Sequence, residues 1–563
     1  MKKGVSIVLA GLIVAALAVA ETPTEAPVSR EEIQTLQDQI NALQAKLNNL
    51  LERAGEAGAP SAGMKAADSP APARTEEIAL APAQGASRGL YSTGAAGQST
   101  TRSPLGEAVK IGGYGSFRFE SNNIDIGPRI GDLPPIRRGF NAFDFRRLVL
   151  TADAAPSDRL RIYSEIEFER FHKMEIERTA IPENLGQRNR AGIRFVEGIE
   201  GQGGSELKME QAWAQYDFAR PLRFRMGVIL PPVGRFNIHH DDDYWDLPRR
   251  PLVDRGGPVL PVAAAWSDLG AGLVGNQPLG EGYLDYQFYV MGGTKLNFSL
   301  EKTVSLRQGR NLVEVEPEIG FDSGPFNGTN PGHALGWRMA YSPKAGNEVA
   351  LSGYHGRYTP DFLNVKSSIH TLGFDGKLSY KRFELEGEFV FTDFGRMEGV
   401  LRDIAAQGVN AAAETSSGEA ARLETEVEAE FAGPFTNQRY GYWVDLKYRF
   451  WPRFLNSTFL GRGFENPQLI PIVRFERIWF NDFVREFTFS GGNITALDKE
   501  NLEQQRISVG LTYRPTAPVA FTAAYEHNQR IQGSTLIFPR VTGLGRLPDK
   551  SYDALTLGVA FGF

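Results

Sequence analysis

The residues of this chain best suited to chemistry are arginines, because one planar guanidinium can bind two oxygens of an oxyanion at once. They are frequent in segment 231–263, which carries charges of both signs, and in the stretches before it. The candidates for anion binding are Arg146, Arg147, Arg159, Arg161, Arg223, Arg225, Arg235, Arg249 and Arg250. The acids Asp241, Asp242 and Asp243 would face them and set a transverse field across a narrow passage. Rings of basic residues select anions, and rings of acids select cations.

These arginines have a second interpretation, which is structural. Acidic residues in the same part of the pattern would pair with them and keep a charged wall soluble and rigid. For any single arginine, this pairing is at least as well supported as anion binding. The acids concerned are Glu165, Glu167, Glu169, Glu384, Glu386, Glu388 and Asp445.

The run from His239 to Asp243 contains residue types that bind metal ions. No second ligand group at a fixed spacing accompanies it, so we predict a solvated acidic loop and no dedicated metal site. Weak binding of calcium, or of cations that bridge lipopolysaccharide, is the most that this run supports. None of the seven histidines lies in a motif with a nucleophile, and the sequence has no phosphate-cradling glycine loop. We therefore expect neither an enzyme nor a cofactor.

The elements that must position these residues are β-strands. From Lys110 onward, apolar and polar residues alternate, which is the period of a strand with two different faces. The alternation runs to the aromatic residue Phe563 at the end of the sequence. We predict about sixteen strands, near 110–122, 141–154, 159–171, 206–218, 222–230, 264–275, 283–292, 334–341, 348–358, 367–380, 382–394, 440–450, 468–480, 504–514, 519–529 and 552–563.

Short and long connections alternate between these strands, as turns and loops do in transmembrane barrels. The connection 451–467 is long where a turn is expected, and 359–366 is short where a loop is expected. The long connections that fit the pattern are 123–140, 172–205, 231–263, 293–333, 395–439, 481–503 and 530–551.

Charges on one face of many strands would destabilise a water-free core between sheets, but they suit a water-filled lumen. We therefore predict an all-β fold in which residues 110–563 form a transmembrane antiparallel β-barrel. The competing fold is a soluble protein of several sheets whose polar faces are solvated. The sequence has no cysteine, which suits an exported protein without disulfides. Its net charge of −6 argues against nucleic acid as a partner.

Three segments precede the predicted barrel. Residues 1–20 have a positive start, an apolar middle and a small-residue ending, which is the pattern of a cleaved signal peptide. Residues 21–54 contain a heptad seam and predict an α-helical coiled coil between chains, or a single amphipathic helix docked on the barrel. Residues 55–109 are rich in Ala, Gly, Pro and Ser and predict a flexible linker. The seam residues are Ile33, Leu36, Ile40, Leu43, Leu47 and Leu50.

Six short motifs follow one another over the first third of the predicted barrel. They are Gly112-Gly113-Tyr114-Gly115-Ser116-Phe117-Arg118-Phe119-Glu120, Phe143-Asp144-Phe145-Arg146-Arg147-Leu148, Glu165-Ile166-Glu167-Phe168, Glu210-Gln211-Ala212-Trp213-Ala214-Gln215-Tyr216, Leu222-Arg223-Phe224-Arg225-Met226-Gly227 and Pro231-Pro232-Val233-Gly234-Arg235-Phe236. In this order they resemble the phosphate- and polyphosphate-selective porins, the porin O and P family of the bacterial outer membrane. The rest of the predicted barrel is similar to that family only in its alternation of aromatic and polar residues.

The resemblance implies a homotrimer of sixteen-stranded barrels embedded in outer-membrane lipid, each with its own pore. The third long loop, 231–263 in this sequence, would fold inward, and basic residues would line the passage. The expected solutes are small and hydrophilic, and anions such as phosphate are the first choice. A general or carbohydrate-permeable porin, in which lumen aromatics such as Trp443 matter more, is the alternative. A structural role, in which the N-terminal helix contacts the cell wall and tethers the envelope, is a third function that the sequence leaves open.

Overall fold

The computed structural model describes most of the chain from residue 109 to its end. The predicted signal peptide, coiled coil and linker lie outside the described residues, except for Val109 at the end of the linker. The described ranges are 109–125, 138–170, 174–184, 191–201, 206–254, 259–263, 265–307, 310–323, 333–414, 436–490, 493–533 and 550–563.

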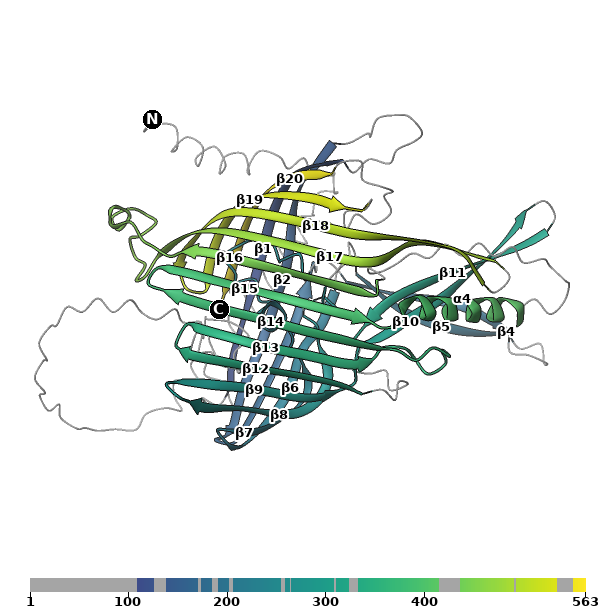
Figure 1. The fold of residues 1–563 in the computed structure, drawn as a ribbon, viewed down its shortest axis with the longest axis horizontal. Helices are drawn as coiled ribbons and strands as arrows, with labels where there is room; N and C mark the ends of the chain where they lie inside the picture. The colour runs from purple at the N-terminus through teal and green to yellow at the C-terminus, as the bar shows by residue number, and fades with distance from the viewer. Residues whose placement is uncertain are drawn as a thin grey trace, which may run out of the picture. The chain divides into compact units, whose positions relative to one another are not determined.

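Sixteen strands form one closed barrel in which hydrogen-bonded neighbours run antiparallel. Figure 1 shows the barrel strands as arrows arranged around a common interior. The prediction of an all-β antiparallel barrel is therefore confirmed. The barrel strands, in order around the sheet, are β1 (Val109–Asp125), β2 (Arg138–Ser157), β3 (Leu160–Glu169), β6 (Glu206–Ala219), β7 (Leu222–Ile229), β8 (Asp268–Leu279), β9 (Gly282–Met291), β12 (Ala334–Lys344), β13 (Asn347–Arg357), β14 (Ser368–Tyr380), β15 (Phe383–Phe394), β16 (Gln438–Tyr448), β17 (Gln468–Ser490), β18 (Asn493–Thr516), β19 (Val519–Gln532) and β20 (Ser551–Gly562).

The barrel closes between its first and last strands. The Gly113 N–H donates to the Phe563 carbonyl oxygen at 3.1 Å, and the Phe563 N–H donates to the Gly113 carbonyl oxygen at 2.9 Å. The register between β1 and β20 continues as far as Asn122, which lies opposite Ala554. A sheet that closes on itself pairs its backbone polar groups internally, which is the condition for crossing a bilayer in strands.

The two faces of the sheet differ as the alternation predicts. Outward-facing apolar side chains remain exposed, among them Phe117, Leu351 and Phe374 at 49%, 49% and 58%. On the opposite face, charged residues such as Glu386 and Arg474 are buried inside the barrel. An apolar outer face with a polar interior is typical of transmembrane barrels.

Further elements lie in the long connections. Two separate two-stranded sheets form, one from β4 (Met174–Asn184) and β5 (Ala191–Gly201), the other from β10 (Lys295–Arg307) and β11 (Arg310–Asp322). The helix α4 (Met397–Glu414) follows β15, and the 3₁₀ helix η1 (Arg453–Leu455) follows β16. None of the helices in the described part of the chain is long and apolar enough to cross a membrane.

The largest difference from the predicted strand boundaries lies at the end of β17 and the start of β18. The sequence predicted a long connection at 481–503, but β17 reaches Ser490 and β18 begins at Asn493. The two strands stay paired through Phe487, which lies opposite Leu497. Three register shifts interrupt this ladder, and such irregularities break the strict alternation that the prediction used.

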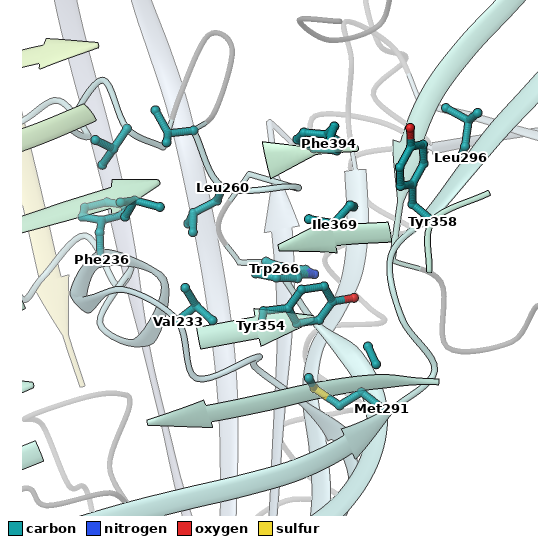
Figure 2. Packing of buried hydrophobic residues seen from close by; sticks show 14 of the residues in the cluster. Val233, Phe236, Leu260, Trp266, Met291, Leu296, Tyr354, Tyr358, Ile369 and Phe394 are labelled. Atoms are coloured by element: carbon teal, nitrogen blue, oxygen red, sulfur yellow. The ribbon is translucent and has the colours of Figure 1, made fainter. Parts of the chain in front are cut away.

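The connection between β7 and β8 is residues 230–267, and we call it the inner loop. Its described residues, 230–254, 259–263 and 265–267, lie inside the barrel. It includes the short helix α3 (Arg235–Ile238). Its apolar side chains pack on inward-facing wall residues, and Figure 2 shows Trp266 beside Tyr354, with Ile369 and Phe394 close by. The Trp266 and Tyr354 rings meet edge to face, with centroids 4.7 Å apart. The expectation that segment 231–263 folds inward is thus confirmed for its described residues.

The backbone of Gly227, near the end of β7, supplies a test of this fold. Its φ is +133°, and a Cβ there would lie 2.2 Å from the Ala212 carbonyl oxygen on β6. We expect Gly227→Ala to lower the free energy of unfolding by about 2–5 kcal/mol, through backbone strain and this clash. The measurement is urea unfolding of the detergent-folded protein, followed by its heat-modifiable gel mobility.

Gly280 provides the matched control, because its φ is +62° and a Cβ there meets nothing within 4 Å. Gly280→Ala should cost only about 1 kcal/mol. Equal losses in the two variants would contradict the close approach of β6 and β7 at Gly227.

Candidate functional site

The inner loop is fixed to the barrel wall by backbone groups that donate to inward-facing side chains. The Gly234 N–H donates to Ser352 Oγ at 3.2 Å, and the Phe236 N–H donates to Glu388 Oε2 at 2.7 Å. Further along, the Leu252 N–H donates to Glu476 Oε2 at 2.6 Å. These contacts reach β13, β15 and β17.

Asp246 is the loop residue with the densest set of ionic contacts. Its carboxylate lies 2.8 Å from Arg514 Nε, 3.0 Å from Arg449 Nη2 and 3.3 Å from Lys447 Nζ. Burial alone would raise the pKa of Asp246, but the charges of Arg449, Arg514 and Lys447 outweigh it and hold the pKa well below its usual range. Asp246 is therefore an ionised anchor between the loop and β16 and β18.

Two loop arginines, Arg235 and Arg249, form a second set of anchors, whereas Arg250 pairs within the loop. Arg235 Nε donates to Glu386 Oε1 at 2.6 Å, and Arg250 Nη1 lies 3.5 Å from Asp254 Oδ2. Arg249 lies between two wall acids that come from different strands. They are Glu120 on β1, 2.6 Å from Arg249 Nη2, and Glu526 on β19, 2.7 Å from Arg249 Nε.

A small cavity lies between the inner loop and β1, β2, β19 and β20. Its lining carries four arginines and a single acid, Asp242. A pocket with that charge balance is chemically suited to an anion. The four arginines are Arg118, Arg146, Arg249 and Arg250.

Arg146 and Arg147, which are adjacent on β2, each pair with an acid on β3, and Arg147 also contacts the inner loop. Arg146 Nη1 lies 3.6 Å from Glu169 Oε1, and Arg147 Nη1 lies 2.6 Å from Glu167 Oε1. Arg147 also reaches the loop, with Nε 3.3 Å from Asp242 Oδ2. The structural interpretation of pairing is thus confirmed for Arg146 and Arg147, while Arg146 also lines the cavity.

Of the remaining candidates for anion binding on the barrel wall, Arg161 lies on β3, and Arg223 and Arg225 lie on β7. Arg161 Nε donates to Asp153 Oδ1 at 2.8 Å, and Arg223 Nε lies 3.5 Å from Asp217 Oδ2. Arg225 Nη2 donates to Gln215 Oε1 at 2.8 Å, and its guanidinium lies 4.0 Å from the centre of the Trp213 ring.

Arg159 was predicted to lie on a strand, at the start of 159–171, and this placement was wrong. It lies in the turn between β2 and β3, and its side chain is exposed. The strand β3 begins one residue later, at Leu160, so the alternation that turns a side chain inward does not yet apply at this position.

The prediction of a solvated acidic run was also wrong. His240, Asp241 and Asp243 are buried, and Asp242 accepts a hydrogen bond from Ser116 Oγ at 2.6 Å. The loop can bury these charges because the wall supplies arginines to meet them. His239 stacks on Tyr244, and burial together with the charge of Arg235 lowers the pKa of His239 to about 3. His239 is therefore neutral at physiological pH.

Several residues of the site escaped the sequence analysis. Arg118 was visible as an inward position of the first strand, between Ser116 and Glu120, but was not chosen. Glu210 gave no signal, because a register shift between β3 and β6 interrupts the alternation beside it. The other missed wall cations, each in contact with the inner loop, are Lys447, Arg449, Arg474, Arg506 and Arg514.

No family model matches the chain. A curated protein of Aquifex aeolicus, described only as an uncharacterized protein, is 29% identical over 189 residues, which are 34% of this chain and 33% of that protein. The match thus spans about a third of the length of that relative.

Among solved structures, an anion-selective porin from Comamonas acidovorans has a TM-score of 0.41 and 9% identity, over 81% of this chain and 99% of that one. The outer-membrane channel DcaP of Acinetobacter baumannii has a TM-score of 0.40 and 10% identity, over 83% and 100%. OmpF of Salmonella typhi has a TM-score of 0.40 and 13% identity, over 81% and 97%. At these scores the similarities add nothing to what the strand order already establishes, a closed sixteen-stranded barrel with a loop inside it.

Asp246 provides a test of how the inner loop is held. Asp246→Asn leaves Arg514 without its carboxylate, and we expect a loss of about 3 kcal/mol in the free energy that fixes the loop, as for other broken buried pairs. Limited proteolysis should then cut within 230–267, where the wild type resists. Asp361→Asn is the control, because Asp361 pairs with Arg357 at an exposed site, where an ion pair is worth at most about 1 kcal/mol. Equal protection of both variants would contradict the anchor.

The depressed pKa of Asp246 also predicts a pH dependence. The unfolded pKa of an aspartate is about 3.9, so the stabilisation by this carboxylate is complete above about pH 4 and is lost as pH falls toward the lower folded pKa. The difference in proteolytic protection between wild type and Asp246→Asn should therefore stay constant from pH 7 to about pH 4.5 and shrink only below that. A difference that already disappears near pH 6 would contradict the assignment.

Proposed function

We propose that this chain is an outer-membrane porin, a water-filled channel through which small hydrophilic solutes diffuse passively. The proposal is supported by a closed barrel that turns apolar side chains outward and charged side chains inward. Outer-membrane lipid would cover the outer face. The proposed transport needs no covalent chemistry, because the wall and the inner loop act only by size and charge.

We propose further that the preferred solutes are anions, phosphate among them. The observation that carries this is the cavity beside the inner loop, whose lining has four arginines and one acid. Guanidinium groups on two different walls of such a cavity could share the oxygens of one tetrahedral oxyanion. Arg118 and Arg146 come from the barrel, whereas Arg249 and Arg250 come from the loop. The resemblance of the first strands to phosphate-selective porins points in the same direction.

A general porin is the second candidate, and a specific observation favours it. The lining arginines have carboxylate neighbours just beyond the cavity, as Arg249 does in Glu120 and Glu526. Such neighbours reduce the net field that a passing anion meets. The homotrimer implied by the same resemblance is also a proposal, and light scattering of the detergent-solubilised protein tests it.

The decisive measurement is the reversal potential of the purified protein in a planar bilayer under a salt gradient, with phosphate added as a competitor. We expect anion preference and block of the chloride current by phosphate. Arg146→Gln should reduce the anion-to-cation permeability ratio several-fold and weaken the phosphate block, because it removes one of the four cationic side chains of the cavity.

Arg159→Gln is the matched control, since it removes the same charge from an exposed turn. It should leave both quantities unchanged. Arg225→Gln tests the other wall, and a larger effect there than at Arg146 would move the anion site from the cavity to β7. Conductance without ion preference would leave a general porin, and a folded barrel without conductance would overturn the channel.

A further inference from the structure

Three metal-ligating side chains meet where the inner loop touches β3 and β6. Glu165 on β3, Glu210 on β6 and His240 on the loop each place one ligand atom so that all three atoms lie within 4.8 Å of one another. All three residues are fully buried. The chain positions of these residues are far apart, so the group exists only because the loop folds into the barrel.

The protonation of His240 is set by a contact outside this group. Its Nδ1 lies 2.9 Å from the Asn237 carbonyl oxygen, an acceptor, so Nδ1 carries a proton. In the neutral imidazole, Nε2 then has a lone pair, and it faces Glu210 Oε2 at 3.2 Å and Asp241 Oδ1 at 3.8 Å. A lone pair and two carboxylates repel one another unless a positive charge lies among them.

The carboxylates also leave oxygens without hydrogen-bond partners. Glu165 Oε2 accepts from Gln211 Nε2 at 2.6 Å, which orients the group and leaves Glu165 Oε1 without a hydrogen bond. Glu210 Oε1 and Asp241 Oδ1 also have no hydrogen-bond partner. Buried carboxylate oxygens are normally paired or bound to a cation, because desolvation without compensation is costly.

The neighbouring arginine is already engaged by other acids. Arg147 contacts Glu167 at 2.6 Å and Asp242 at 3.3 Å. Glu167 also faces Glu210, which adds a further carboxylate to the same buried space. The group around His240 therefore has more carboxylates than cations to match them.

We propose that Glu165, Glu210 and His240 bind a divalent first-row cation such as Zn²⁺, with Asp241 positioned to supply a fourth ligand. One imidazole nitrogen with carboxylate oxygens is a donor set that such ions accept. In a tetrahedral site with bonds of about 2.1 Å, the ligand atoms lie about 3.4 Å apart, so the widest separation in this group would need to close by up to about 1.4 Å. The Nδ1–H bond from His240 to a backbone carbonyl is the support that metal-binding histidines usually have.

The ion would join the inner loop to β3 and β6, whereas Asp246 joins the loop to β16 and β18. Its role is structural, because it links β3 and β6 to the start of the acidic run. The proposal does not depend on the solute that the channel passes.

The test uses the full chain, folded in detergent, stripped with EDTA and titrated with Zn²⁺. We expect one zinc ion per chain to survive gel filtration by elemental analysis, and an absorption-edge spectrum with nitrogen and oxygen ligands at about 2.0–2.2 Å. Zinc should also raise the midpoint of urea unfolding of the wild type. In Glu165→Gln and His240→Gln, zinc affinity should fall at least tenfold, and the zinc-dependent shift should disappear.

His239→Gln is the matched control, because it changes the adjacent histidine, which stacks on Tyr244 outside the group. It should bind zinc as the wild type does. Should Glu165→Gln fail to fold, His240→Gln and the wild-type stoichiometry still decide the matter. A folded wild type that retains no zinc would overturn the proposal and leave a proton shared between His240 and Glu210 as the compensating charge. Equal zinc binding by His240→Gln and the wild type would overturn it as well.

Discussion

The structure depends on the matching of charges inside a closed barrel. Because the inner loop lies in the lumen, wall residues that would otherwise be hydrated become buried, and each charge needs a partner on the loop or on a neighbouring strand. Asp246 contacts three cations, and Arg249 contacts two acids. Such pairs add little net stability over apolar residues of the same size, but removing one partner is costly. The pairs therefore determine where the loop lies more than they determine how stable the barrel is.

This constraint divides the lumen into two unlike sides. Toward β13–β15 the loop packs through apolar contacts, with Trp266, Tyr354 and Phe394 in one cluster, as Figure 2 shows. Toward β1, β2, β19 and β20 it leaves a cavity lined by arginines. Apolar packing excludes water on the side of the loop that faces β13–β15.

The barrel could be predicted from the sequence because the period of two is local. The alternation within a single strand identifies its two faces. Leu222, Phe224 and Met226 therefore indicate one apolar face of β7, whichever strands pair with it. The partners inside the lumen could not be predicted in this way. Arg514 and Asp246 are separated by 268 positions and Leu252 and Glu476 by 224, and no local pattern connects residues so distant. For the same reason, the burial of His240 was missed: the sequence shows an acidic run, and only the loop's path places it against Glu210.

The chemistry of the inner loop is concentrated in eleven consecutive positions, 240–250. His240 faces the acids of β3 and β6, Asp246 lies among the cations of β16 and β18, and Arg249 and Arg250 reach the cavity. Asp242 connects these regions, since it contacts Arg147 on the wall and lies 3.7 Å from Arg250 on the loop. A short chain segment fixed at both ends has few ways to move, so the cavity arginines are held by contacts made elsewhere. Selectivity in this barrel would thus be set by the anchors of the loop as much as by the residues that a solute touches.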